Sequence, residues 1–213
     1  MKVKILVTGA SGFVGFHLVS AAFEAGYEVH AAVRRSSQVS DICPFVEKFV
    51  YPDFNQKSSL AALFSSEKYD YVIHAAAMTK AKSEKEMKDA NVGITEDLLE
   101  AAFHIPDPPK RIVFVSSLAA IGPVGYLEKP ITESTPYQPV TMYGRSKHDA
   151  EKMIREKFVD KPISIIRPTA VYGPREKDLF ILFTYGAAPR NHKQPCSHYD
   201  AGNGMDRPLK ISF

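Results

Sequence analysis

Residues 3–15 read VKILVTGASGFVG, and this stretch decides the fold. Its first five residues are mostly β-branched or aliphatic and predict a strand, while apolar side chains at helical spacing over residues 14–25 predict a helix. Glycine occupies every third position of the intervening loop. Gly9 permits a tight turn, Gly12 permits a close approach to the backbone, and Gly15 lets helix and strand pack closely. The stretch therefore predicts the first unit of an α/β domain.

The beginning of this helix is a predicted phosphate site. The first backbone N–H groups of a helix have no partner within the helix, and the helix dipole places partial positive charge there. A glycine-rich turn leading into such an end is suited to a pyrophosphate. The predicted cofactor contacts in this loop are Thr8, Gly9, Ser11, Gly12, Phe13, Val14 and Gly15.

Beyond this unit, short β-branched runs alternate with longer helical patterns. Such alternation predicts right-handed βαβ units and a doubly wound parallel sheet, with strand order 3-2-1-4-5-6. Near-continuous apolar strands fit a sheet that is covered on both faces. The further predicted strands are residues 28–33, 48–51, 71–74, 111–115 and 163–166, and the further helices are residues 60–65, 87–103 and 142–158.

The composition changes near Phe183. Residues 184–213 are rich in proline, glycine and asparagine, contain no valine and show no periodicity. We therefore expect a dinucleotide-binding domain over residues 1–183. The remaining 30 residues are predicted to be an irregular tail or the remnant of a truncated or minimal substrate region, with a short strand at residues 209–213.

Composition narrows the class of protein. The 213 residues are 45% hydrophobic and 24% charged with a net charge of +3, which argues against disorder and against a nucleic-acid footprint. Cys43 and Cys196 form no metal-binding or disulfide pattern, so no metal is expected. A strand at the N-terminus leaves no room for a signal peptide, and no apolar run is long enough to span a membrane, so we expect a cytoplasmic protein.

Tyr143 and Lys147 are four residues apart in a predicted helix and should share one face. A tyrosine titrates near pH ~10, and a nearby ammonium is expected to lower its pKa, so the pair could move a proton. Ser117 follows the fifth strand, whose carboxyl end should meet the same crevice. We expect Ser117 to orient a substrate oxygen and the neighbouring Ser116 to bond to backbone.

The Thr-Gly-x-x-Gly-x-x-Gly loop together with Ser117, Tyr143 and Lys147 resembles the short-chain dehydrogenase/reductase superfamily. The similarity is greatest to its extended branch, the NAD-dependent epimerase/dehydratase family, and it covers residues 1 to about 183. It implies an NAD(P)-dependent oxidoreductase that transfers hydride between nicotinamide and an alcohol or carbonyl. In that family the matching serine is catalytic, the tyrosine is the general acid/base, and the lysine also holds the nicotinamide ribose.

The end of the second strand bears on the choice of cofactor. NAD enzymes place an acid there for the ribose hydroxyls, and strand counting assigns that position to Val33. Arg34 and Arg35 follow, and a guanidinium can bind a 2′-phosphate that a carboxylate would repel. The sequence therefore favours NADP, with NAD possible.

The resemblance implies further cofactor contacts after other strands. Asp53 matches the aspartate that contacts adenine, and the alanines after the fourth strand let the cofactor pass over the backbone. Pro168 would end the sixth strand and leave backbone groups for the nicotinamide. His74 is expected to be a packed histidine, and Asn91 to be structural. The remaining predicted contacts are Phe54, Ala75, Ala76, Ala77 and Thr169.

Three functions stay open on the sequence: an oxidoreductase, a sugar-nucleotide epimerase, and a dinucleotide-binding module with little or no turnover. Dehydratases of the family carry an Asp-Glu pair directly after the catalytic serine, where this chain has Leu118 and Ala119, so dehydration is disfavoured. The expected partner is a small molecule, either a carbonyl or alcohol or a nucleotide sugar. A homodimer through residues 87–103 and 142–158 is also expected, because family members often pair two such helices.

Overall fold

The computed structural model describes residues 2–125 and 130–176. The chain divides into two units, residues 1–169 and 170–213, and the fold that follows is that of the first unit. The predicted domain end at residue 183, the tail, the strand at residues 209–213 and Cys196 lie outside the described residues.

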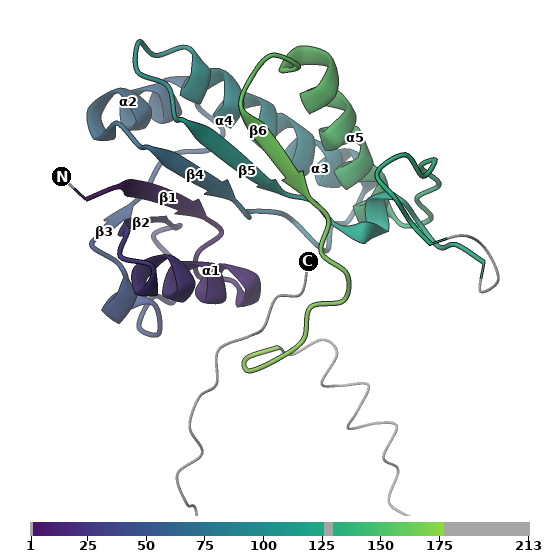
Figure 1. Ribbon diagram of the computed structural model, residues 1–213, viewed down its shortest axis with the longest axis horizontal. Coiled ribbons are helices and arrows are strands. Elements are labelled where there is room, and N and C mark those ends of the chain that lie inside the picture. The colour runs from purple at the N-terminus through teal and green to yellow at the C-terminus, as the bar shows by residue number, and fades with distance from the viewer. Residues whose placement is uncertain (1, 126–129, 177–213) are drawn as a thin grey trace, which may run out of the picture. The chain divides into compact units, whose positions relative to one another are not determined.

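A six-stranded parallel sheet forms the centre of the first unit, in the order β3-β2-β1-β4-β5-β6 (Figure 1). This is the predicted doubly wound topology, and it is confirmed. Because all the strands run the same way, their carboxyl ends lie along one edge of the sheet. The strands are β1 (Lys4–Thr8), β2 (Glu28–Ala32), β3 (Lys48–Val50), β4 (Tyr71–His74), β5 (Arg111–Val115) and β6 (Ile163–Ile166).

Helices cover both faces of this sheet. The alternation of side chains along β1 shows why: Ile5 and Val7 pack with Val19 of α1 (Phe13–Glu24), whereas Leu6 belongs to the apolar cluster on the other face. With both faces buried, the strands are apolar on both sides. Figure 1 shows α1 on one face of the sheet and α2 (Lys57–Glu67), α4 (Ile94–Phe103) and α5 (Met142–Lys157) on the other.

The predicted single helix over residues 87–103 is wrong in detail. The structure has α3 (Glu84–Lys88), then a π-helical turn over Asp89–Gly93, then α4. Ser83 caps α3, since its hydroxyl accepts a hydrogen bond from the backbone N–H of Glu86 at 3.2 Å. The hydrophobic periodicity of a sequence continues across a π-turn, because the turn adds one residue without ending the helix. The pattern therefore did not indicate the division into three segments.

Two 3₁₀ turns complete the described elements, Cys43–Phe45 and Leu118–Ala120, and Cys43 is a free, exposed thiol. Within residues 2–125 and 130–176, the structure contains no helix that is long and apolar enough to cross a bilayer.

Candidate functional site

The predicted site residues gather at the carboxyl edge of the sheet. Each lies at or after the carboxyl end of a strand, in the first turn of α1, or in α5, so the parallel topology brings together segments that are far apart in the sequence. The glycine loop follows β1, Arg34 follows β2, Asp53 follows β3, Ala75–Ala77 follow β4, Ser117 follows β5, and Pro168 and Thr169 follow β6.

Close backbone contacts explain two glycines of the loop. Gly9 has φ +68°, and a Cβ atom there would lie 2.7 Å from the backbone nitrogen of Ala76. A Cβ atom on Gly15 would lie 2.0 Å from the carbonyl oxygen of Gly9. Only residues without a side chain allow β1, β4 and α1 to approach this closely.

The start of α1 fits a phosphate group. Gly12 is the N-cap residue and supplies no side-chain cap, and the first turn contains no acidic residue. The helix thus keeps its N-terminal N–H groups and its dipole without an internal anion. Ser11, Phe13 and Val14 are partly buried beside this end.

A buried chain of hydrogen bonds lies beneath the loop. The Thr8 hydroxyl accepts a hydrogen bond from the backbone N–H of Ala76 at 3.1 Å and lies 2.8 Å from His74 Nδ1. His74 Nε2 lies 3.0 Å from the hydroxyl of Thr95, which itself donates to the carbonyl oxygen of Asn91 at 2.7 Å. Nε2 therefore carries the proton, and Nδ1 accepts one from Thr8. The Thr8 side chain is committed to this interior network.

His74 and Asn91 have the packed roles expected of them. Burial, followed by the charge of Lys147, lowers the pKa of His74 to about 3, so the ring is neutral at physiological pH. The Asn91 side chain accepts from the backbone N–H of Met78 at 2.7 Å and donates to the Met78 carbonyl at 2.8 Å. It also donates to Ser146 at 2.9 Å, and so connects the segment after β4 to α5.

The end of β2 presents arginine and no acid. Val33 is buried, whereas Arg34 is exposed and forms a turn with Ser37, whose backbone N–H donates to the Arg34 carbonyl at 2.9 Å. The Arg35 guanidinium lies 5.3 Å from the centre of the Tyr51 ring. Arg34 is thus exposed one residue after Val33, which holds the position where an NAD enzyme places a carboxylate.

Asp53 and Phe54 have structural roles in the turn after β3. The carboxylate of Asp53 accepts a hydrogen bond from the backbone N–H of Asn55 at 3.0 Å, and its own N–H donates to the Ser59 hydroxyl at 2.9 Å. This is the geometry of an Asx turn. Phe54 packs against the apolar cluster of α2 and α4.

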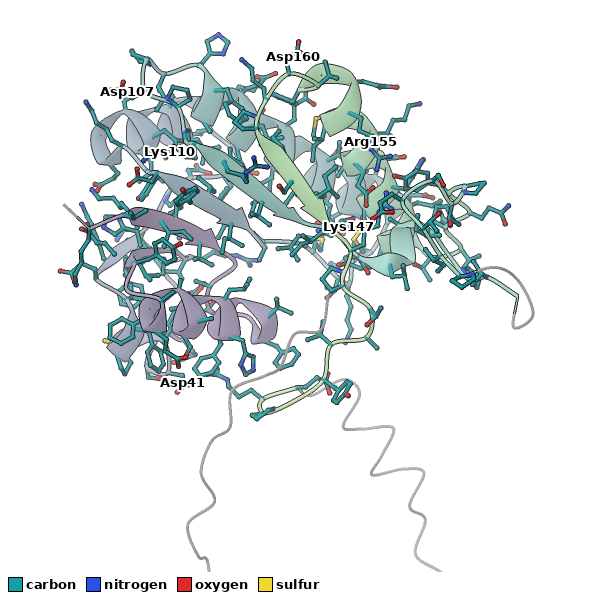
Figure 2. All side chains as sticks on the ribbon, viewed as in Figure 1. Asp41, Asp107, Lys110, Lys147, Arg155 and Asp160 are labelled. Atoms are coloured by element: carbon teal, nitrogen blue, oxygen red, sulfur yellow. The ribbon has the colours of Figure 1, made fainter. Side chains whose placement is uncertain are left out.

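The three predicted catalytic residues come together between β5 and α5. Thr141 caps α5 by accepting from the Gly144 N–H at 2.9 Å, which fixes where the helix begins. The ammonium of Lys147, labelled in Figure 2, donates to the Val115 carbonyl at 2.8 Å and lies 5.9 Å from the centre of the Tyr143 ring. The Tyr143 phenol lies within reach of the Ser117 hydroxyl, which also accepts from the N–H of Ala119 at 3.2 Å.

The protonation states differ from the prediction. Burial raises the pKa of the Tyr143 phenol, and the hydrogen bond to Ser117 only partly opposes this. The Lys147 ammonium donates to the Val115 carbonyl, and the pKa of the phenol stays above its ordinary value. Burial also lowers the pKa of Lys147 to about 8, against the opposing effect of Glu151. Tyr143 and Lys147 are therefore both predominantly protonated at neutral pH.

The predicted backbone contact of the Ser116 hydroxyl is wrong, because the hydroxyl donates to Glu151 Oε1 at 2.5 Å. The carbonyl of Pro168 accepts from the N–H of Leu118 at 2.9 Å and keeps a second lone pair, so its contact with the nicotinamide stays a prediction. Both partners are distant in sequence, which is why a local pattern did not indicate them.

Sequence reasoning also missed a buried charged cluster around Glu151. Its carboxylate is fully buried and contacts Arg167, Ser116 and Tyr137. The available signal was weak: Glu151 is four residues after Lys147 on the same helix face, and Arg167 directly precedes Pro168.

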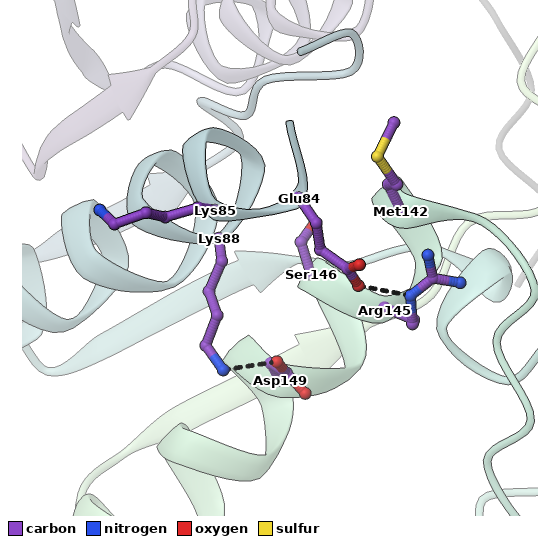
Figure 3. Close-up of a pocket in the computed structure, with 7 residues that line it drawn as sticks. All are labelled: Glu84, Lys85, Lys88, Met142, Arg145, Ser146 and Asp149. Carbon is purple, nitrogen blue, oxygen red and sulfur yellow. Dashed lines mark hydrogen bonds and ion pairs between the residues drawn. The ribbon is translucent and has the colours of Figure 1, made fainter. Parts of the chain in front are cut away.

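A recess lies beside this site rather than in it. It measures about 300 Å³ between α3 and the beginning of α5 (Figure 3). Two ion pairs cross it, Arg145 with Glu84 at 2.5 Å and Lys88 with Asp149 at 3.0 Å. None of the three predicted catalytic residues lines it; its walls are Glu84, Lys85, Lys88, Met142, Arg145, Ser146 and Asp149.

A doubly wound sheet with a glycine loop between β1 and α1 defines a Rossmann-type nucleotide-binding domain. The profile of the NAD-dependent epimerase/dehydratase family matches residues 5–204. The chain belongs to this family, within the extended short-chain dehydrogenases/reductases, as the resemblance of the sequence predicted.

Individual relatives are enzymes of this family. The UDP-glucose 4-epimerase of Vibrio cholerae is 31% identical over 189 residues, which cover 84% of this chain and 55% of that protein. The dTDP-D-glucose 4,6-dehydratase of Mus musculus is 27% identical, over 96% of this chain and 59% of that protein. A structure of UDP-glucose 4-epimerase from Brucella ovis in complex with NAD has a TM-score of 0.67 and 27% identity, over 78% of this chain and 51% of that one. The chain spans little more than half the length of these relatives.

Proposed function

We propose that this chain binds a nicotinamide dinucleotide and serves hydride transfer at an alcohol or carbonyl carbon. The observation that carries the proposal is the assembly of Ser117, Tyr143 and Lys147 at the sheet edge that also bears the glycine loop. A hydroxyl, a protonated phenol and a buried ammonium are the groups that a carbonyl oxygen needs when its carbon is reduced.

The beginning of α1 and the glycine loop would hold the pyrophosphate of the cofactor, and a bound nicotinamide supplies or accepts the hydride. NADP is the preferred form in this proposal, since the buried Val33 replaces the usual acid and Arg34 is exposed beside it. The NAD bound to the Brucella relative supports NAD as the second candidate.

The residues around the reacting oxygen have separate roles in this proposal. Ser117 hydrogen bonds to the substrate oxygen and orients it. Tyr143, whose phenol pKa is raised by burial, donates its proton to that oxygen during reduction and accepts it back during oxidation. The Lys147 ammonium places positive charge beside the phenol and so favours loss of the phenolic proton as the oxygen takes it.

A nucleotide-sugar 4-epimerase is the second candidate, supported by the relative from Vibrio cholerae. Epimerisation returns the hydride to the same substrate and needs no further acid or base. Dehydration would need one, and the positions after Ser117 are Leu118 and Ala119 within a 3₁₀ turn. Hydride exchange with free cofactor distinguishes the two activities, because only a reductase releases its oxidised cofactor in each cycle.

Replacing Tyr143 with Phe tests the proposal. The variant Tyr143→Phe should lower kcat by about 10²–10⁴-fold, since it removes only the proton donor, and should leave the cofactor Kd within about threefold. Tyr27→Phe is the matched control, because Tyr27 packs against Tyr71 at the beginning of β2, away from the carboxyl edge.

The assay combines a cofactor titration with turnover of nucleotide sugars and small aldehydes, followed by nicotinamide absorbance and product analysis. If Tyr143→Phe turned over substrate at the wild-type rate, Tyr143 would not be the proton donor. Tight cofactor binding by a wild-type chain that converts no substrate would favour the third reading, a dinucleotide-binding module.

A further inference from the structure

Glu151 extends the catalytic face of α5 by one turn. Tyr143, Lys147 and Glu151 are spaced by four residues, so their side chains lie on one side of the helix. Each meets the strand-end segment 115–117 that follows β5. Lys147 donates to the carbonyl of Val115, Glu151 accepts from the hydroxyl of Ser116 at 2.5 Å, and the Tyr143 phenol lies within reach of Ser117.

The carboxylate of Glu151 is held more tightly than a surface acid would be. Its side chain is 0% exposed. Arg167 donates hydrogen bonds to both carboxylate oxygens, with Nε 3.0 Å from Oε1 and Nη2 2.7 Å from Oε2. Tyr137 donates to Oε2 at 2.8 Å. Burial alone would raise the pKa of Glu151, but the hydrogen bonds from Arg167, Ser116 and Tyr137 outweigh it and lower the pKa, so the group is a buried anion.

These partners come from three segments other than α5. Ser116 follows β5, Arg167 follows β6, and Tyr137 lies in the segment that leads into α5. Arg155, on the next turn of α5 and labelled in Figure 2, adds a guanidinium 3.3 Å from Oε2 and 5.3 Å from the centre of the Tyr137 ring. One carboxylate thus joins the ends of two strands, the catalytic helix and the segment that precedes it.

We propose that Glu151 is a positioning residue for the Ser-Tyr-Lys set, acting through Ser116 on the backbone of its neighbour Ser117; this inference rests on the proposed function. Adjacent Cα atoms are about 3.8 Å apart along a rigid peptide, so anchoring Ser116 fixes where the hydroxyl of Ser117 meets Tyr143. A displacement of the order of 1 Å at such a site is costly to rate.

The charge of Glu151 has a second effect, on Lys147. The ammonium is buried over the Phe114 ring at 4.7 Å, and the titratable groups that face it are Glu151, Tyr143 and His74. Tyr143 and His74 are neutral at physiological pH, so the carboxylate is the group that favours the charged lysine. Removing the carboxylate should lower the pKa of Lys147 below its value of about 8.

The experiment compares Glu151→Gln with Glu156→Gln. Glu156 lies on the same helix, but its side chain is 64% exposed and its ion pair is a 3.9 Å contact with Lys152. The first measurement is NMR of protein labelled at lysine ¹³Cε and tyrosine ¹³Cζ, without substrate. We expect Glu151→Gln to lower the pKa of Lys147 and to shift the NMR signal of Tyr143. In assays kcat should fall about tenfold or more with the cofactor KM within about threefold. Glu156→Gln should match wild type in the pKa of Lys147, the Tyr143 signal, kcat and the cofactor KM.

A second variant, Ser116→Ala, keeps the ion pair with Arg167 and removes only the link to the strand end. It should fold, shift the NMR signal of Tyr143 and lower kcat by about three- to tenfold. If Glu151→Gln does not fold, Ser116→Ala alone tests the positioning role of Glu151. Folded variants at both positions whose Lys147 and Tyr143 signals and kcat equal those of Glu156→Gln would overturn the inference. A wild-type chain that converts no substrate refutes the proposed function instead, and the two NMR readouts then decide the role of Glu151.

Discussion

Replacing Gly15 with alanine should weaken cofactor binding while the protein still folds. In Gly15→Ala the new Cβ would lie 2.0 Å from the carbonyl oxygen of Gly9 and 2.8 Å from the Cα of Ala10. Both are backbone atoms, and the Gly9 oxygen also accepts the N–H of Gly12 at 3.0 Å. Ordinary contact requires the loop and α1 to separate by about 1 Å or more, because neither side has a flexible atom that can move away.

The magnitude follows from two opposing effects. Alanine is favoured over glycine within a helix by ~1 kcal/mol, whereas overpacking a tight site costs about 1–3 kcal/mol. We therefore expect Gly15→Ala to lose up to ~2 kcal/mol in the free energy of unfolding. The same shift moves the phosphate loop, and losing one charge-assisted hydrogen bond of about 1.5–3 kcal/mol weakens NADPH binding by at least about tenfold.

Gly93→Ala is the matched control. A Cβ atom at Gly93 meets no other atom within 4 Å, so the same substitution should leave stability unchanged or raise it by up to ~1 kcal/mol, with cofactor affinity retained. Urea unfolding gives the stability of each variant, and nicotinamide fluorescence gives its affinity. A Gly15→Ala variant that is as stable as Gly93→Ala and binds NADPH as the wild type does would contradict this prediction.

Two further predictions concern single side chains. The pKa of His74 is about 3 in the folded state, below its ordinary 6.5, so on acidification the unfolded chain takes up a proton at a higher pH than the folded protein does. The stability that neutral His74 contributes is therefore complete above pH 6.5 and is lost as the pH falls toward 3. At ~1.4 kcal/mol per pH unit, wild type should lose about 2 kcal/mol at this site between pH 7 and pH 5, and urea unfolding of His74→Gln should lack that loss; an equal loss in the variant would contradict the prediction. Arg34→Ala should weaken NADPH binding by about 10–100-fold and leave NADH binding unchanged, since it removes a charge-assisted contact to the 2′-phosphate. Equal affinity of wild type for the two cofactors in a fluorescence titration would refute it.

The sequence by itself determined the topology and the convergence of the predicted site residues. Strand and helix periods are local, so six strands and the glycine loop could be predicted from neighbouring residues. Once the strands are parallel, their carboxyl ends must share an edge, which brings Ser117 to the helix of Tyr143 and Lys147 without any knowledge of side-chain contacts.

Only the tertiary structure decided how the charged and polar groups inside the site are paired. Glu151 has the sequence setting of an exposed helical acid, yet its burial depends on Arg167 and Tyr137, which other segments supply. Asn91, which lies in the π-turn, likewise binds the backbone of Met78 in another segment, and the raised pKa of the Tyr143 phenol follows from burial. Solvation and hydrogen bonding are set by whichever segments pack nearby, and a local sequence pattern carries no record of them.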